Sequence, residues 1–188
     1  MKPESVRSID DLQSLVRKGI RPKYQFFWGH KPRYVGSIDQ SCLSNWFPSP
    51  FEVDSITYPT LEHYMMAEKA RLFGDEEIRT EILAAENPGK AKSLGRKVKG
   101  FNEETWTSNR FGIVVAGAVA KFTQNRELGE FLLRTGNKVL VEASPQDRIW
   151  GIGMNAQHEH ANKPQKWNGL NLLGFALMEA RQRMLTQD

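Results

Sequence analysis

The stretch Tyr58-Pro-Thr-Leu-Glu-His-Tyr-Met-Met-Ala-Glu-Lys-Ala-Arg-Leu-Phe73 decides how the rest of the chain is interpreted. It predicts a helix that begins after Pro59, with Thr60 as N-cap, because a threonine hydroxyl can accept a hydrogen bond from a first-turn amide. At 100° per residue the helix carries one apolar stripe, made by Leu61, Tyr64, Met65 and Leu72. We expect this stripe to face the core and the rest of the chain to pack around it.

Two charged side chains, Glu62 and Lys69, fall on the shoulder of this stripe. Seven residues separate them, which is almost two turns and about 10 Å along the helix axis. Side chains lean toward the N-terminus of a helix, so the long arm of Lys69 points back toward Glu62. The spacing predicts a carboxylate and an amine that flank one small ligand. The alternative is an ion pair on a solvated face, because such pairs are common and contribute little to stability.

Composition indicates a single domain with a sizeable core, since the chain has 188 residues of which 39% are hydrophobic. The net charge of +4 permits anionic ligands such as phosphates or nucleic acid but does not require them, because the basic residues are scattered among acids. The single cysteine, Cys42, excludes an intrachain disulfide and a zinc site built on a cysteine pair.

The chain shows no sign of a membrane partner. Its longest strongly apolar run, residues 113–120, is too short to span a bilayer. The first residues lack the apolar segment of a signal peptide. We therefore expect a soluble, cytoplasmic protein.

The other elements read mostly as helices. We expect residues 1–22 to form an N-terminal extension, with a short helix capped by Ser8, and residues 23–188 to form one domain. Further helices are expected at residues 75–86, 88–98, 103–123, 126–134 and 170–185, and short strands at 24–28, 51–53, 56–58 and 139–141. In the long helix Gly117 indicates a close approach by a neighbouring helix. The fold class is thus mainly α, a compact single-domain helical fold with a few short strands.

Two irregular segments, residues 44–47 and 147–153, are rich in aromatic and small polar residues, which favours a functional role. In the second, Trp150 beside Gly151 and Gly153 is typical of a stacking platform next to exposed backbone amides. The alternative is a tryptophan that fills the core under a glycine turn. Residues 151–156 spell a dinucleotide fingerprint, but no strand leads into it and no convincing helix follows, so we exclude that site.

The pair His158 and His160 in a polar loop is a weak metal signal, and we expect neither a metal nor a cofactor.

Several motifs in a fixed order resemble the NADAR family, also called YbiA-like, over about residues 24–186. They are Leu43-Ser-Asn-Trp-Phe47, Tyr58-Pro-Thr-Leu-Glu-His-Tyr64 with Lys69, Leu94-Gly-Arg96, Trp106, Asp147-Arg-Ile-Trp-Gly-Ile-Gly153 and Asn171-Leu-Leu-Gly174. The resemblance implies a compact, mostly helical fold and N-glycosidase chemistry on ribosyl compounds.

The resemblance implies two substrate groups, both amine glycosides of a phosphorylated ribose. One is the phosphoribosylamino-pyrimidine intermediates of riboflavin synthesis, and the other is ADP-ribose on the guanine amino group of nucleic acid. We expect a hydrolase acting on a small phosphorylated ribosyl substrate of the first group, with ADP-ribosylated nucleic acid as the alternative. A different class remains open, a non-catalytic module that binds ADP-ribose or single-stranded nucleic acid on its tryptophans.

Carried onto this chain, the family motifs assign roles to individual residues. Glu62, Lys69 and Asp147 are implied as catalytic, with Lys69 either binding phosphate or attacking a ring-opened sugar as a Schiff-base amine. The expected substrate-binding residues are Ser44, Asn45, Arg96, Trp106, Arg110, Trp150, Gly151 and Gly153. Family members often carry an acid between the two loop glycines, where this chain has Ile152, so Asp147 is the better candidate for a second carboxylate.

Overall fold

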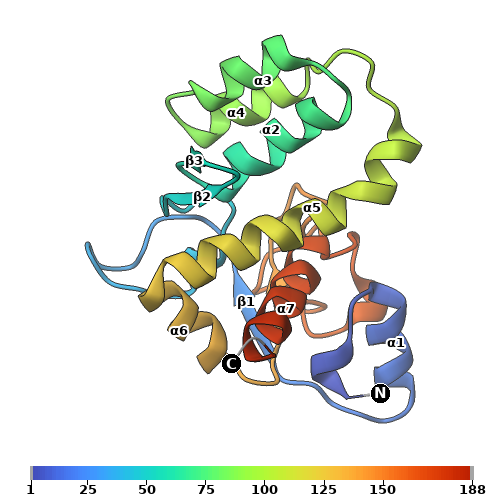
Figure 1. Ribbon diagram of the computed structural model, residues 1–188. Coiled ribbons are helices and arrows are strands. Elements are labelled where there is room, and N and C mark those ends of the chain that lie inside the picture. Colours follow the sequence, from blue (N-terminus) through green and yellow to red (C-terminus); the bar gives the residue numbers. More distant parts are fainter. Residues whose placement is uncertain (1, 187–188) are drawn as a thin grey trace. The chain divides into compact units, whose positions relative to one another are not determined.

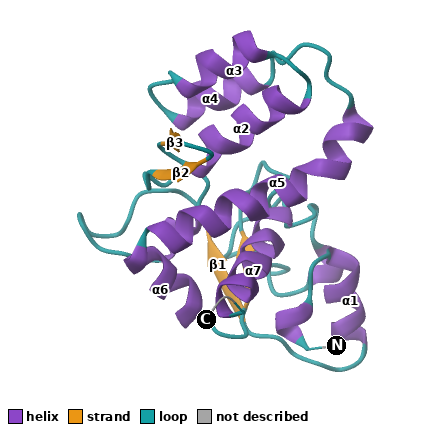
Figure 2. Cartoon of the chain, viewed as in Figure 1, coloured by secondary structure: helices purple, strands orange, loops and turns teal. Residues whose placement is uncertain are grey.

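The structure is a computed structural model that describes residues 2–186. Helices make up about half of these residues, and short strands and loops join them (Figure 1; Figure 2). The chain divides into two compact units. One unit runs to Ser44 and resumes at Glu127, and the other spans Asn45–Arg126. The predicted mainly helical fold is confirmed, whereas the predicted boundary after residue 22 stays a prediction.

The unit Asn45–Arg126 contains four helices and a hairpin. They are β2 (Phe51–Val53), β3 (Ile56–Tyr58), α2 (Leu61–Leu72), α3 (Glu76–Leu83), α4 (Pro88–Gly95) and α5 (Glu103–Gln124). The predicted N-cap Thr60 is confirmed, since its Oγ1 accepts a hydrogen bond from the His63 amide. At the start of α5, Asn102 Oδ1 likewise accepts one from the Thr105 amide. β2 and β3 pair in antiparallel fashion, and their turn residues Asp54 and Ser55 have φ of 50° and 62°.

Helix α2 is buried on nearly all sides, which differs from the single predicted stripe. All residues of the run Leu61–Glu68 are buried, Glu62 among them. The reason is that α2 packs against α3, α4 and α5, which together cover more than one face. Glu68, which lies one turn after Tyr64 and Met65 of the predicted stripe, is paired with Arg71, whose Nη2 lies 2.6 Å from Glu68 Oε2.

Gly117 of α5 is the point where α2 and α5 approach closely. A Cβ at this position would lie 2.4 Å from Tyr64 Cδ1 and 2.6 Å from Leu61 Cδ1. The close approach predicted at Gly117 is thereby confirmed, and this contact holds the helix that carries Glu62 and Lys69.

The other unit is built on a parallel pair of strands, β1 (Tyr24–Phe27) and β4 (Val139–Glu142), with Tyr24 opposite Val139. Helix α7 (Leu172–Leu185) packs on β4. Its remaining elements are α1 (Ile9–Arg17), α6 (Arg126–Arg134) and 3-10 helices at Pro3–Ser5, Gln40–Leu43 and Pro164–Lys166. Residues of the expected N-terminal extension pack into this unit, since Leu12 and Leu15 are buried and Arg7 Nε lies 2.6 Å from Glu179 Oε2.

Asn171 explains why α7 begins at Leu172, two residues later than expected. It is fully buried with a left-handed φ of 55°, which asparagine tolerates better than most residues. Its Oδ1 accepts a hydrogen bond from the Glu142 amide, and its Nδ2 donates one to the Leu140 carbonyl. The side chain thus joins the start of α7 to the backbone of β4.

None of the helices within residues 2–186 has the length and apolar character needed to cross a bilayer.

Candidate functional site

Glu62 lies in the first turn of α2 and is only 2% exposed. Its backbone amide donates a hydrogen bond to the Asn45 carbonyl at 3.0 Å, so the loop that carries Asn45 is fixed to the start of the helix. Because Glu62 is buried, it is not part of an ion pair on a solvated face, which was the alternative interpretation of Glu62 and Lys69. A buried carboxyl group is the kind of side chain whose proton affinity an enzyme can adjust by its surroundings.

Lys69 lies two turns further along α2 in a setting made by α4, α5 and the segment between them. Its Nζ donates a hydrogen bond to the Gly95 carbonyl at 2.8 Å. The same atom lies 4.3 Å from the ring centre of Phe101 and 5.6 Å from that of Trp106. Desolvation by burial lowers the pKa of Lys69, and the negative charge of Glu103 opposes this shift. A larger fraction of this amine is therefore unprotonated near neutral pH than for an exposed lysine.

Arg110 extends this cluster along α5. It is 7% exposed, and its Nη1 lies 3.8 Å from Glu103 Oε1. Its Nε is buried and has no hydrogen-bond partner among the described residues. Glu103, Trp106 and Arg110 follow one another at helical spacing, so one side of the first half of α5 presents an acid, an indole and a guanidinium.

Asn45 has a similar unused group. It is 6% exposed, and its Oδ1 has no hydrogen-bond partner within residues 2–186. A buried amide oxygen without a partner is unfavourable unless a ligand or water supplies a donor. Asn45 is thus suited to accept a hydrogen bond from a substrate hydroxyl near the start of α2. Ser44, the preceding residue, ends the 3-10 helix Gln40–Leu43 and is also buried.

The Asp147 loop belongs to the unit that contains β1 and β4. Asp147 Oδ1 accepts hydrogen bonds from the Ile149 amide at 2.9 Å and the Trp150 amide at 2.7 Å. Its carbonyl accepts a third from the Gly153 amide at 3.1 Å. Asp147 therefore shapes the turn that carries Trp150, which is half-buried.

Gly151 and Gly153 both lie where a side chain would come too close to neighbouring atoms. A Cβ at Gly151 would lie 2.9 Å from the Glu142 carbonyl oxygen. Gly153 has a φ of 66°, in the left-handed region that favours glycine, and a Cβ there would lie 2.9 Å from Asn168 Cβ. These contacts account for both glycines through backbone packing, and their predicted part in substrate binding stays a prediction.

The model of the NADAR domain matches residues 26–185 of the chain. The chain belongs to the NADAR family. It is 43% identical over 165 residues to N-glycosidase R617 of Acanthamoeba polyphaga mimivirus, covering 85% of this chain and 95% of that protein. It is 34% identical over 151 residues to N-glycosidase YbiA of Escherichia coli, covering 80% and 86% of the two proteins.

The NMR structure of Escherichia coli YbiA resembles this NADAR protein with a TM-score of 0.66 and 28% sequence identity, over 99% of this chain and 93% of that one. The predicted family and fold are confirmed. The protein is an N-glycosidase, a hydrolase of N-glycosyl bonds, as expected.

Within the NADAR domain the predicted site residues are divided between the two units. The unit Asn45–Arg126 holds Asn45, Glu62, Lys69, Arg96, Trp106 and Arg110, and the other unit holds Ser44, Asp147, Trp150, Gly151 and Gly153. In the first set, Lys69 contacts Trp106, and Arg110 lies near Glu103, whose charge acts on Lys69. Arg96 is exposed and directly follows Gly95, whose carbonyl accepts the hydrogen bond from Lys69. The catalytic and binding roles of all these residues stay predictions.

Sequence reasoning did not connect Phe101, Gly95 or Glu103 with Lys69, which they surround. Phe101 stands outside any helical period, and a backbone carbonyl carries no sequence signal. It also missed Lys121 of α5, which is fully buried with its Nζ 5.7 Å from the Phe47 ring centre. The position of Lys121, one turn after Gly117 on the buried face, could have revealed it. Among the described residues, no three His, Cys, Asp or Glu side chains gather closely enough to hold a metal ion.

Proposed function

We propose that this N-glycosidase hydrolyses the ribosyl C–N bond of phosphorylated ribosylamine compounds, of the phosphoribosylamino-pyrimidine type that occurs in riboflavin synthesis. The observation that supports this most directly is the setting of Lys69. Its amine is held by one carbonyl and bordered by two aromatic rings, and burial lowers its pKa. An amine of this kind is suited to nucleophilic attack on a sugar carbon.

The proposed reaction begins with opening of the ribose ring. The lone pair of the linking nitrogen forms a C=N bond to the anomeric carbon, and the ring oxygen leaves as a hydroxyl after it receives a proton. The free amine of Lys69 then adds to this carbon, and the original amine leaves with a proton, so that the sugar is joined to Lys69 as an imine. Water adds to the imine, and the C–N bond to Lys69 breaks. One water is consumed, and the free amine and the ribose are released.

Glu62 is the group that we propose for proton transfer in these steps. It lies on the same helix as Lys69, is buried, and is tied through its amide to Asn45. A positioned carboxyl group can donate a proton to the opening ring oxygen and accept one from the attacking water. We retain Asp147 as a proposed second carboxylate.

The proposed substrate contacts use buried groups of the unit that contains Lys69. The guanidinium of Arg110, with a buried Nε that lacks a partner among the described residues, suits a phosphate. Trp106 offers an indole for stacking against the base. We propose that Asn45 Oδ1, a buried acceptor without a partner among the described residues, accepts a hydrogen bond from a ribose hydroxyl. We further propose that Ser44, Arg96, Trp150, Gly151 and Gly153 contribute to binding.

The test combines turnover with chemical trapping. The purified protein is incubated with a phosphoribosylamino-pyrimidine and sodium borohydride, which reduces an imine to a stable amine that mass spectrometry locates. We expect a ribose phosphate adduct on Lys69 and none in Lys69→Met. The matched control is Lys97→Met, a change of an exposed lysine in the same unit, which is expected to keep both adduct and turnover.

Glu62→Gln is expected to lower kcat by about 10²- to 10⁴-fold, the usual effect of losing a general acid or base. Full activity of both Glu62→Gln and Lys69→Met would overturn the assignment. Turnover of an ADP-ribosylated guanine compound, with none of the pyrimidine, would favour the second substrate group. Calorimetric binding of ADP-ribose without turnover of either compound would favour a non-catalytic binding module.

A further inference from the structure

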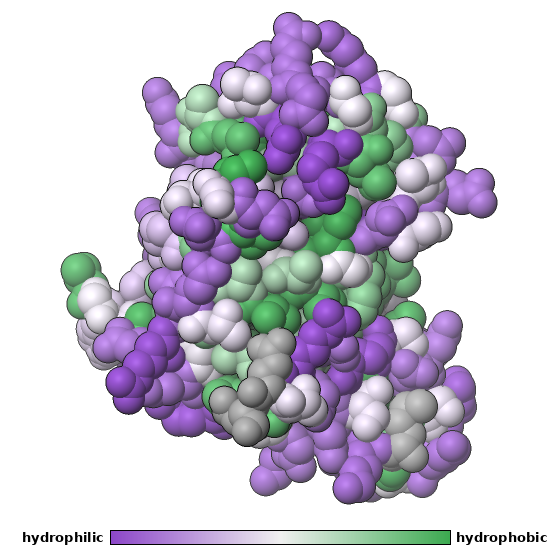
Figure 3. All heavy atoms as spheres, in the orientation of Figure 1, coloured by the Kyte–Doolittle hydropathy of each residue, from purple (hydrophilic) through white to green (hydrophobic). Residues whose placement is uncertain are grey.

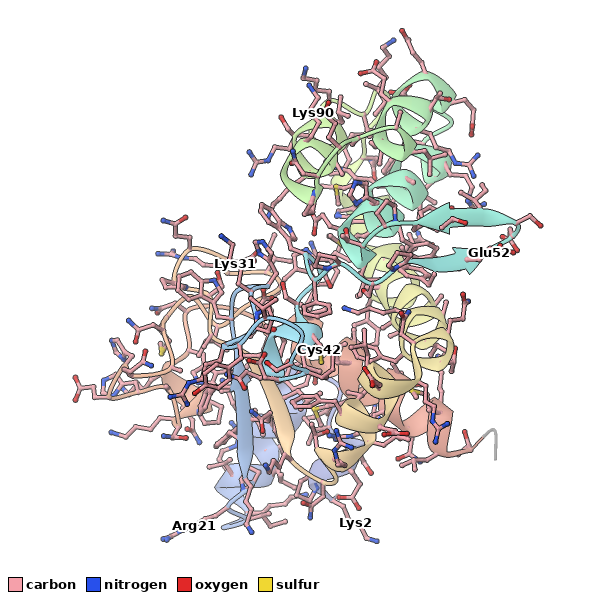
Figure 4. All side chains as sticks on the ribbon, turned by 90° about the vertical axis from the view of Figure 1, so that its left-hand side faces the viewer. Lys2, Arg21, Lys31, Cys42, Glu52 and Lys90 are labelled. Carbon is pink, nitrogen blue, oxygen red and sulfur yellow. The ribbon has the colours of Figure 1, made fainter. Side chains whose placement is uncertain are left out.

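The segment around β1 contains basic residues but no acidic residue. Between Asp11 and Asp39 there is no acidic residue, although acids are almost as frequent as bases in the whole sequence. The same segment contains six basic residues, all of them exposed: Arg17, Lys18, Arg21, Lys23, Lys31 and Arg33. In Figure 4, Arg21 and Lys31 lie near opposite ends of β1. Basic residues therefore lie near both ends of the strand.

Aromatic side chains lie between these charges. Tyr24 and Phe26 are partly exposed, point to the same side of β1, and have ring centres 5.8 Å apart. Trp28 follows in the same alternation and is 63% exposed, and Tyr34 in the next loop is 66% exposed. From Tyr24 to Trp28 the extended chain spans about 13 Å.

We infer that β1 and the loop that follows it, residues 21–35, form a binding surface for single-stranded nucleic acid. Surfaces of this kind combine basic residues, which follow the phosphate backbone, with aromatic rings, on which successive bases stack. Both parts are present in residues 21–35, which contain no acid. Asp39, the nearest acid along the chain, accepts a hydrogen bond from the Arg33 amide at 2.7 Å. None of its residues is among those proposed for glycoside cleavage, so the inference does not rest on the proposed function.

A lipid surface is the main competing partner for exposed aromatic and basic residues. Figure 3 shows apolar atoms at the tip of the loop that lies on the left in Figure 1. Val35, in the segment after β1, is fully exposed. However, the aromatic rings of Tyr24 and Phe26 lie along the strand and not at this tip, and membrane binding needs a larger apolar face. The row of rings between two groups of cations favours a linear polyanion that carries bases.

The test measures binding of a fluorescent oligothymidylate of about 12 nucleotides, a length within the range that such surfaces cover. Fluorescence anisotropy is recorded over a series of salt concentrations with the full chain. We expect Trp28→Ala with Tyr34→Ala to weaken binding about tenfold or more, because base stacking is lost. Lys31→Gln with Arg33→Gln should weaken binding and reduce the slope of log K against log salt by about 1.4, as for two lost phosphate contacts.

The matched control is Lys90→Gln with Lys97→Gln, which removes the same charge from exposed positions of the other unit. It is expected to leave affinity within about twofold of the parent chain. Thermal unfolding checks that each variant is folded. Three results would overturn the inference: no binding at low salt, equal losses in the control and the Lys31/Arg33 variant, or no loss in the aromatic variant. Binding to phosphatidylserine vesicles without binding to the oligonucleotide would assign the segment to a lipid surface instead.

Discussion

Lys69 Nζ donates its hydrogen bond to the Gly95 carbonyl at 2.8 Å, and this carbonyl lies in the last turn of α4. The carbonyl ends of helices carry partial negative charge, which favours an ammonium group. Even so, the pKa of Lys69 is lowered, because desolvation by burial disfavours the charged form and outweighs the opposing charge of Glu103. The balance between these effects decides how much free amine is available for attack.

Phe101 contributes to the burial of Lys69, which leads to a prediction on the pH profile. A reaction that needs the free amine rises with pH through the pKa of Lys69 and then levels off. Phe101→Ala admits water to Nζ, so the pKa of Lys69 should move back toward its ordinary value and the rise should shift to higher pH. Phe101→Leu keeps apolar bulk and should shift it less. The measurement is kcat/KM against pH, and an unshifted profile in Phe101→Ala would contradict the idea.

Asp147 offers a test that separates the shape of a turn from proton transfer. An asparagine keeps the oxygen that accepts hydrogen bonds from the Ile149 and Trp150 amides, but it cannot exchange a proton. We expect Asp147→Asn to unfold at the same denaturant concentration as the parent and to lose activity by about 10²-fold or more. Asp147→Ala should lose both stability and activity. An active Asp147→Asn would limit Asp147 to its part in the turn.

Much of the helical structure was predictable because its signals are local. Thr60 and Asn102 cap their helices through amides three residues away, and this pattern is visible in any short window of sequence. The pairing of β1 with β4 was not predictable in this way. Tyr24 and Val139 are far apart in the sequence, and neither strand carries information about the register of the other.

The candidate site was predictable to a similar extent. Helical spacing placed Glu62 and Lys69 on the same helix, but their burial depends on α3, α4 and α5, which the period of one helix does not report. Since α2 is covered on several sides, its acids Glu62 and Glu68 are buried together with its apolar residues, and Lys69 is half-buried. The carbonyl of Gly95 and the ring of Phe101 enter the setting of Lys69 only through tertiary packing.

Gly117 and Gly112 of α5 form a matched pair for testing the contact between α2 and α5. Gly117→Ala places a methyl group against Tyr64 and Leu61, and we expect it to lower the free energy of unfolding by about 1–3 kcal/mol, as for an overpacked core. A Cβ at Gly112 meets no atom within 4 Å. Gly112→Ala should therefore raise stability by about 0.5–1 kcal/mol, because alanine favours a helix more than glycine does. If Gly117→Ala and Gly112→Ala change the free energy of unfolding equally in urea, the close contact at Gly117 does not affect stability.

The hydrogen bonds of the His63 ring lead us to expect that the protein loses stability in mild acid. Its Nε2 donates a hydrogen bond to the Ala85 carbonyl at 3.1 Å, a partner that can only accept, so Nδ1 at 2.8 Å from Thr60 Oγ1 accepts from that hydroxyl. Both bonds fit the neutral ring, and burial lowers the pKa of His63.

Because the folded-state pKa lies below the unfolded value of about 6.5, the unfolded chain binds the proton more readily. The contribution of His63 to stability is therefore fully present above about pH 6.5 and is lost as the pH falls from there through the lowered pKa. Urea unfolding at a series of pH values should show this decrease in the parent chain. His63→Gln, whose amide can donate to Ala85 and accept from Thr60 without titrating, should show a smaller decrease. If both proteins lose stability in parallel between neutral pH and pH 5, His63 is not the group responsible.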